Sequence, residues 1–129
     1  MSPAARQALT FLGLLGLCAA YLQGGLNKLL DFSGAVAEAA HFGLPLPAAT
    51  AALTIALELA ASAMVLSGRL RWLGALALML FTLAATLLAN RYWALPPGEA
   101  RFMMANAFYE HLGLAGAFLL VALWDRERA

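Results

Sequence analysis

Long apolar runs separated by short polar segments are the main pattern in this chain. A helix of about 20 residues is long enough to cross the ~30 Å hydrocarbon core of a bilayer. Four runs meet that length, and we predict a helix in each of them: 8–30, 48–66, 72–89 and 106–124. The pattern therefore predicts an all-α integral membrane four-helix bundle, with one domain over residues 1–129.

The first run shares features with a secretory signal peptide, because Arg6 precedes it and small residues follow it. It continues to Leu30, beyond signal-peptide length. In addition, Leu17 precedes Cys18, where a lipoprotein cleavage site requires a small residue. We therefore interpret this run as a retained first span.

The basic residues are distributed unequally between the two ends of the predicted spans. By the positive-inside rule, the end richer in Lys and Arg faces the cytoplasm, so we expect both termini to be cytoplasmic. That end carries five of the eight basic residues, Arg6, Arg69, Arg71, Arg126 and Arg128, and the other end carries Lys28, Arg91 and Arg101. The aromatic residues fit two interfacial belts, Trp72 and Trp124 on the inner side and Tyr92, Trp93 and Tyr109 on the outer side.

The predicted connections differ in kind. The segment 67–71 is a tight turn, which makes the second and third spans antiparallel neighbours. In the first outer loop, 31–47, we expect a short interfacial helix capped by Ser33, with Phe32, Val36 and Ala40 on one face. Small residues are expected where helices touch: Gly16, Ala20, Gly24, Ala52, Ala56, Ala60, Gly113 and Gly116.

Composition agrees with a membrane location. The chain is 64% hydrophobic and 12% charged, about half the charge of an average soluble domain. Its formal net charge of +1 provides no basic patch, so we expect no nucleic-acid partner. The expected partners are membrane lipid, lipid-soluble molecules and other membrane chains. Cys18 is alone, which excludes an internal disulfide or a Cys-x-x-Cys redox couple.

Glu58 lies near the middle of the second predicted span. A charged residue there costs about 2.5 to 3.5 kcal/mol, so it needs a partner or a wet cavity. Polar side chains recur at four-residue spacing in every span, mostly in the outer half, and we expect them to converge on one outward-facing pocket. They are Gln23, Asn27 and Lys28, then Thr54, Glu58 and Ser62, then Thr82, Thr86 and Asn90, and finally Asn106, Glu110 and His111.

These residues allow several interpretations. Lys28 and Glu58 could form an ion pair that only fixes helix register, or they could belong to a functional pocket. Bis-histidine haem ligation by His41 and His111 is disfavoured, because His41 falls in the predicted surface helix. A metal centre of Glu58, Glu110 and His111 lacks the Glu-x-x-His pairs of di-iron bundles, so we predict no metal site.

Six short motifs together resemble the DoxX family. They are GLNKLLD at 25–31, GLP at 43–45, LE at 57–58, GRLR at 68–71, Trp93, and HLGLAG at 111–116. The resemblance implies a four-helix membrane protein, with members that are small subunits of quinone-linked oxidoreductases or belong to redox-stress complexes. The resemblance carries over best to Gly25, Lys28 and Glu58.

Three positions depart from the family pattern. Ala60-Ala61-Ser62 replaces a Gly-rich patch after the glutamate, Ala89-Asn90 replaces Phe-His, and Glu110-His111 replaces Lys-Asn. The His and Asn have thus exchanged helices, which could preserve a hydrogen-bonded pair across the bundle. Glu110 in place of a basic residue changes the charge of the expected pocket.

From the residues and the resemblance we expect a small subunit of a quinone- or quinol-linked redox complex in the bacterial inner membrane. Lys28 and Glu58 are the expected catalytic pair, and Gln23, Asn27, Asn90, Asn106, Glu110 and His111 the expected ligand-binding residues. We expect no covalently bound cofactor, a quinone or quinol as ligand, and a larger complex or a homo-oligomer as the assembly. The alternatives are a purely structural subunit and, less favoured, a small-solute carrier.

Overall fold

The computed structural model describes residues 1–128, so the last residue of the predicted domain, Ala129, lies outside the described residues. The described chain is helical and contains no strand. Its elements are α1 (Pro3–Leu30), α2 (Phe32–His41), α3 (Pro47–Ser67), α4 (Arg71–Ala89), η1 (Tyr92–Ala94) and α5 (Glu99–Arg128). Four of these helices, α1, α3, α4 and α5, are long and apolar enough to cross a membrane, which confirms the predicted fold class.

Two of the long helices begin earlier than predicted. α1 starts at Pro3 because Ser2 caps it: the Ser2 side chain accepts a hydrogen bond from the backbone N–H of Ala5 at 3.1 Å. α5 starts at Glu99, directly after Gly98. The predicted bounds followed the apolar runs, whereas the first residues of these two helices include the charged Arg6, Glu99 and Arg101 and lie outside the runs.

A helix is present in the first outer loop as α2 (Phe32–His41), but its predicted cap was wrong. Its cap is Asp31, whose carboxylate accepts from the backbone N–H of Gly34 at 3.1 Å, whereas Ser33 lies inside the helix and donates to Asp31. The face that α2 buries against the rest of the protein carries Ala35 and Ala39, whereas Phe32 and Ala40, two of the three residues expected on one apolar face, are exposed. The reason is that α2 packs on α3, and small side chains allow that close contact.

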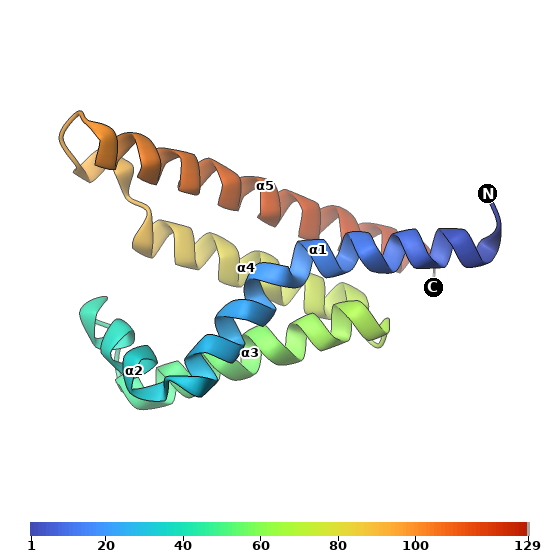
Figure 1. Cartoon of the computed structure of the whole chain (residues 1–129), viewed down its shortest axis with the longest axis horizontal. Coiled ribbons are helices and arrows are strands. Elements are labelled where there is room, and N and C mark those ends of the chain that lie inside the picture. Colours follow the sequence, from blue (N-terminus) through green and yellow to red (C-terminus); the bar gives the residue numbers. More distant parts are fainter. Residues whose placement is uncertain (129) are drawn as a thin grey trace.

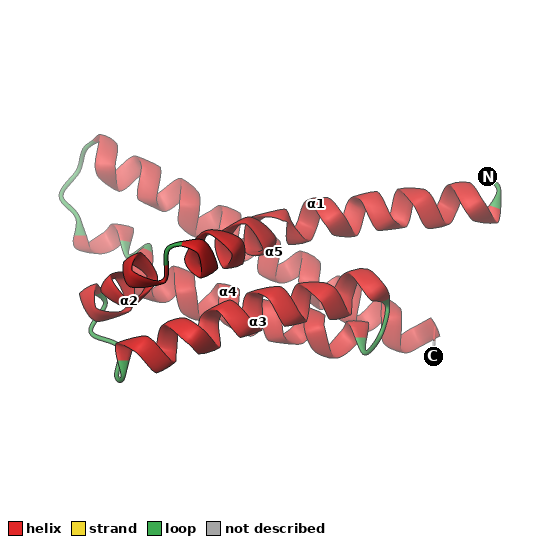
Figure 2. Cartoon of the chain, turned by 60° about the horizontal axis from the view of Figure 1, so that its bottom comes forward, coloured by secondary structure: helices red, strands yellow, loops and turns green. Residues whose placement is uncertain are grey.

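The long helices form neighbouring antiparallel pairs. α3 and α4 are joined by a tight turn in which Gly68 has a φ of 83° and Leu70 a φ of 52°. α4 packs along α5, and α1 packs on α3. Figure 1 shows both termini and the α3–α4 turn at one end of the bundle, and α2 with the loop around η1 at the other. Figure 2 shows that the connections between the helices are short.

The core joins all four long helices around two aromatic rings. Tyr21 packs edge-to-face against Phe118 at a centroid distance of 5.4 Å, and Phe118 is fully buried. The Tyr21 hydroxyl also forms a hydrogen bond with Thr82 on α4. The remaining buried members of this cluster are Leu14, Cys18, Ala61, Val65, Ala75, Leu78 and Ala122.

The expected contact positions of small residues were wrong for seven of the eight residues. Gly16, Ala20, Ala52, Ala56, Ala60, Gly113 and Gly116 are exposed on the isolated chain. The closest backbone approach is at Gly74, where an added Cβ would lie 2.7 Å from the carbonyl oxygen of Ala61. Lipid and protein core are both apolar, so a small residue in a span does not indicate which of the two its face contacts.

Candidate functional site

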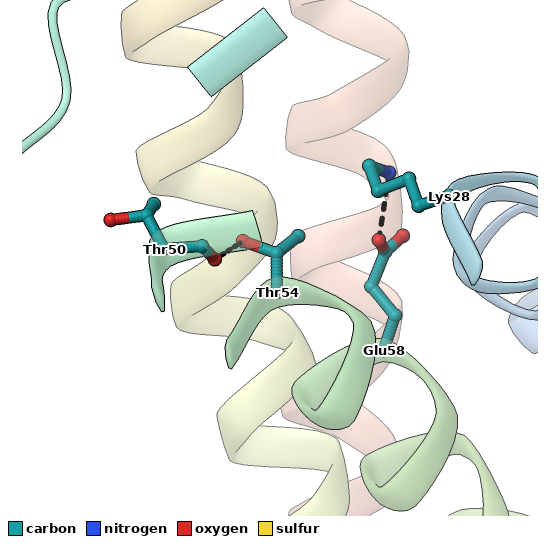
Figure 3. Close-up of polar contacts among 4 residues, drawn as sticks. All are labelled: Lys28, Thr50, Thr54 and Glu58. Carbon is teal, nitrogen blue, oxygen red and sulfur yellow. Dashed lines mark hydrogen bonds and ion pairs between the residues drawn. The ribbon is translucent and has the colours of Figure 1, made fainter. Parts of the chain in front are cut away.

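A buried ion pair joins α1 to α3. The Lys28 ammonium lies 2.8 Å from Oε1 of Glu58, and the Glu58 side chain is 4% exposed (Figure 3). Lys28 is in the last turn of α1, where a cation interacts favourably with the helix dipole. The structure thus provides the partner that the sequence required for a carboxylate in a span.

Gly24 makes room for this pair. It lies one helical turn before Lys28 and therefore on the same face of α1. A Cβ at this position would lie 3.0 Å from Oε2 of Glu58 and 3.5 Å from Nζ of Lys28. The absence of a side chain at Gly24 consequently allows the Glu58 carboxylate to lie against the α1 backbone.

A cavity of about 450 Å³ opens beside the ion pair. It lies in the half of the bundle that contains α2, and all five α-helices contribute to its wall. Most of the wall is apolar and much of it is alanine, with Tyr21, Phe42 and Phe81 as its aromatic members. The polar wall residues are Lys28, Glu38, Thr50, Thr54, Glu58 and His111.

The hydroxyl groups of the wall are already committed as donors. Thr50 donates to the carbonyl of Pro45 at 2.6 Å, and Thr54 donates to the carbonyl of Thr50 at 2.9 Å (Figure 3). Thr82 donates to the carbonyl of Leu78, so the hydrogen between Thr82 and Tyr21 belongs to Tyr21. The three wall hydroxyls, those of Tyr21, Thr50 and Thr54, can therefore accept a hydrogen bond from a ligand but have no hydrogen left to donate to one.

Lys28 is a wall residue that can still donate hydrogen bonds to a ligand. Its ammonium group has three hydrogens, and the contact with Glu58 uses one of them. The side chain is 24% exposed, which leaves the ammonium accessible from the cavity. An acceptor atom of a ligand, such as a carbonyl oxygen, would therefore bind at Lys28.

His111 also lines the cavity. Its Nδ1 lies 2.7 Å from the carbonyl oxygen of Ala107, and this contact assigns a hydrogen to Nδ1. In the neutral ring, Nε2 is then an acceptor. The cavity thus combines a donor at Lys28 with acceptors at Glu58 and His111.

The predicted amides of α1 do not line this cavity. Gln23 and Asn27 are exposed, and neither belongs to the cavity wall. Gln23 is five residues before Lys28 and is therefore rotated about 140° from it around the helix. Asn27 is one residue before Lys28 and is rotated about 100° from it. The structure does not bring these two residues together with Lys28.

The other predicted ligand-binding residues also lie outside the wall. Asn106 and Glu110 are exposed on α5, and the same rotations separate them from His111. Asn90 donates its side-chain N–H to Thr86 at 3.0 Å within α4. Of the eight predicted site residues, the structure therefore brings Lys28, Glu58 and His111 to one cavity.

Sequence reasoning missed the contribution of α2 to the cavity. Ala35, Glu38 and Ala39 of α2 line it, together with Phe42 directly after the helix, whereas the sequence was expected to place this helix in the membrane surface. The spacing of Ala35, Ala39 and Phe42 carries a signal for the face that lines the cavity, since these residues lie three and four positions apart.

The fold and this cavity define the class of the protein: it is a multi-pass helical membrane protein with a polar pair in an apolar pocket. A family model described as DoxX matches residues 9–91, and the chain belongs to the DoxX family. The matched region contains Lys28 and Glu58, and it ends before His111.

One relative extends the similarity into α5. The chain is 27% identical over 120 residues to the inner membrane protein YphA of Escherichia coli strain K12, covering 93% of this chain and 85% of YphA. No solved structure matches the chain. This protein is accordingly a multi-pass protein of the bacterial inner membrane.

Proposed function

We propose that this protein is a small membrane subunit of a quinone-linked redox complex and that its cavity receives a quinone or quinol head group. The observation that carries the proposal is the arrangement of donors and acceptors in an apolar wall. A quinone carbonyl accepts a hydrogen bond, which Lys28 can donate, and a quinol hydroxyl donates one, which Glu58 or His111 can accept.

The walls suit a flat, apolar ring. Phe42, Phe81 and Leu88 line the same cavity as the polar pair, and an aromatic side chain can pack against a ring either by offset stacking or by its edge. The cavity is also within reach of lipid-soluble molecules, because the helices that enclose it are the membrane-spanning ones.

The chemical role of the chain would be to orient the head group and to move its protons. Quinone and quinol interconvert by transfer of two electrons and two protons. Glu58 is a proton donor or acceptor held by Lys28, and Nε2 of His111 is a second acceptor on the same wall. The electrons would pass to and from redox groups of a partner subunit, since Cys18 is the single cysteine of this chain.

We also propose that both termini face the cytoplasm and that the cavity opens toward the outer leaflet. Both termini and the α3–α4 turn, which together carry five of the eight basic residues, lie at one end of the bundle. The cavity lies in the other half, toward α2.

The experiment is a comparison of Glu58→Gln with Glu110→Gln in the complex purified from membranes in mild detergent. Both substitutions remove one carboxylate, but only Glu58 lines the cavity. We expect Glu58→Gln to abolish quinol-dependent turnover while the complex still assembles, and we expect Glu110→Gln to be as active as the wild type. Extraction of quinone from the purified complex provides a second readout. Normal turnover in Glu58→Gln would reject the proton role.

A structural subunit is the second candidate, and the buried Lys28–Glu58 pair itself favours it, because such a pair can fix the register of two helices. In that case, the double substitution Lys28→Met with Glu58→Leu should leave the partner subunits fully active. The quinone proposal predicts loss of turnover and of bound quinone in the same variant.

A further inference from the structure

A second cavity, also of about 450 Å³, lies at the opposite end of the bundle and is lined by basic residues from three helices. Arg6 comes from α1, Arg71 from α4 and Arg128 from α5. Among residues 1–128, no Asp or Glu lines this cavity. Its wall therefore carries three positive charges and no described negative charge.

Two of these arginines lie over the same aromatic ring. The guanidinium carbon of Arg71 is 5.5 Å from the centroid of the Trp124 ring, and that of Arg128 is 4.7 Å from it. Cation–π contacts with the Trp124 ring thus place the two positively charged guanidinium groups beside the same cavity. An anion placed between them would offset their mutual repulsion.

The described part of the chain provides no such anion. Within residues 1–128, no carboxylate lies within salt-bridge distance of Arg6, Arg71 or Arg128. The nearby carboxylate of Asp125 accepts the backbone N–H of Trp72. Arg71 is held by a hydrogen bond from its Nε to the carbonyl of Val65 at 2.7 Å, which leaves both of its terminal amino groups as donors.

We propose that this cavity binds the phosphate group of an anionic phospholipid. Guanidinium groups present paired N–H donors that match phosphate oxygens, and the wall adds Gln7 and Thr10 as neutral hydrogen-bonding side chains. Basic pockets between membrane helices are suited to lipid head groups of this kind. The site is separate from the cavity at Lys28 and Glu58, and it does not depend on the function proposed for that cavity.

A lipid fits the surroundings better than a soluble phosphate. Phe11 lines the same cavity and is 47% exposed, so the site has an apolar edge on a membrane-spanning helix. Trp124 belongs to the aromatic residues that favour the membrane interface. A molecule with a phosphate and acyl chains can satisfy the arginines and cover Phe11 together.

The test measures lipid binding to the purified full-length chain by native mass spectrometry in detergent. Phosphatidylglycerol, phosphatidylcholine and inorganic phosphate are added separately. The cavity variant is Arg6→Gln and the matched control is Arg69→Gln, since each removes one positive charge and Arg69 is exposed at the same end but does not line the cavity. Circular dichroism checks that each variant keeps its helix content.

We expect the wild type and Arg69→Gln to retain phosphatidylglycerol over phosphatidylcholine. Each cavity arginine that is removed should weaken phosphatidylglycerol binding about fivefold. Equal retention of the two lipids by the wild type, or equal losses in the cavity variant and the control, would overturn the proposal. Inorganic phosphate that displaces phosphatidylglycerol and binds as tightly would reject the lipid and identify a site for soluble phosphate.

Discussion

Asp125, near the C-terminal end of α5, accepts a hydrogen bond from the backbone N–H of Trp72 in the first turn of α4, at 3.0 Å. The residue that precedes α4, Leu70, makes no side-chain capping bond. Asp125 of α5 therefore caps the N-terminus of α4, and this hydrogen bond links the ends of the two helices.

Replacing Asp125 by Ala should lower the free energy of unfolding by about 1 kcal/mol, the usual cost of losing a helix cap. The measurement is thermal or denaturant unfolding in detergent, with Glu127→Ala as the control, because Glu127 is an exposed acidic residue on the last turn of the same helix. Equal stability of the two variants would show that the contact with Trp72 contributes nothing.

The Lys28–Glu58 pair predicts a non-additive effect on stability. Lys28→Met leaves a buried carboxylate without its partner, and the cost should be about 3 kcal/mol, at the low end for buried pairs because the Lys28 side chain is 24% exposed. Adding Glu58→Leu removes the unpaired group, so most of the lost stability should return. A double-mutant cycle measures this coupling, and additive losses would contradict it.

Gly74 and Gly116 form a matched pair for testing helix contact. A Cβ at Gly74 would lie 2.7 Å from the carbonyl oxygen of Ala61 and 2.9 Å from Cβ of Met64, and neither atom can rotate away. We expect Gly74→Ala to destabilise the protein by about 1 to 3 kcal/mol. At Gly116 nothing lies within 4 Å, so alanine should be neutral or stabilising. Equal thermal stability of the two variants would contradict the close packing of α3 on α4.

Ser62 has a fully buried hydroxyl oxygen that makes no strong hydrogen bond among residues 1–128, since its polar neighbour is the thiol of Cys18, a weak hydrogen-bonding group. Burying such a group costs about 1 to 3 kcal/mol. Ser62→Ala should therefore leave the unfolding temperature unchanged or raise it. Thr82→Val provides the contrast and should lower it, because Thr82 bonds to both Tyr21 and Leu78. A loss of stability in Ser62→Ala as large as in Thr82→Val would contradict this prediction and show that the contact between Ser62 and Cys18 is strong.

The spans and the central ion pair could be predicted from the sequence, and the reason is energetic. Crossing a bilayer requires about 20 apolar residues in succession, and a carboxylate among them requires a partner, so Glu58 pointed to a cation such as Lys28. Both requirements can be recognised in the sequence, the first as a long apolar run and the second as an acidic residue within it. The helices and the Lys28–Glu58 contact are accordingly confirmed.

The faces of the helices could not be predicted in the same way. In a soluble protein the polar face marks the solvent, but here the outer face of each span is as apolar as the inner one. Gln23 and Asn27 were expected beside Lys28 and are exposed on another face of α1. The apolar spacing of Phe32, Val36 and Ala40 likewise did not identify the face of α2 that packs on α3, which carries Ala35 and Ala39.

The cavity beside Glu58 owes its volume to short side chains, since seven of its nineteen wall residues are alanine. Replacing any of them by Val or Leu would shrink the chamber by a methyl group or more without disturbing the charged pair. Under the proposed function, ligand size and ligand chemistry would thus be set by different residues, so that a change of alanine side chains would alter the size of the accepted ligand while Lys28 and Glu58 are retained.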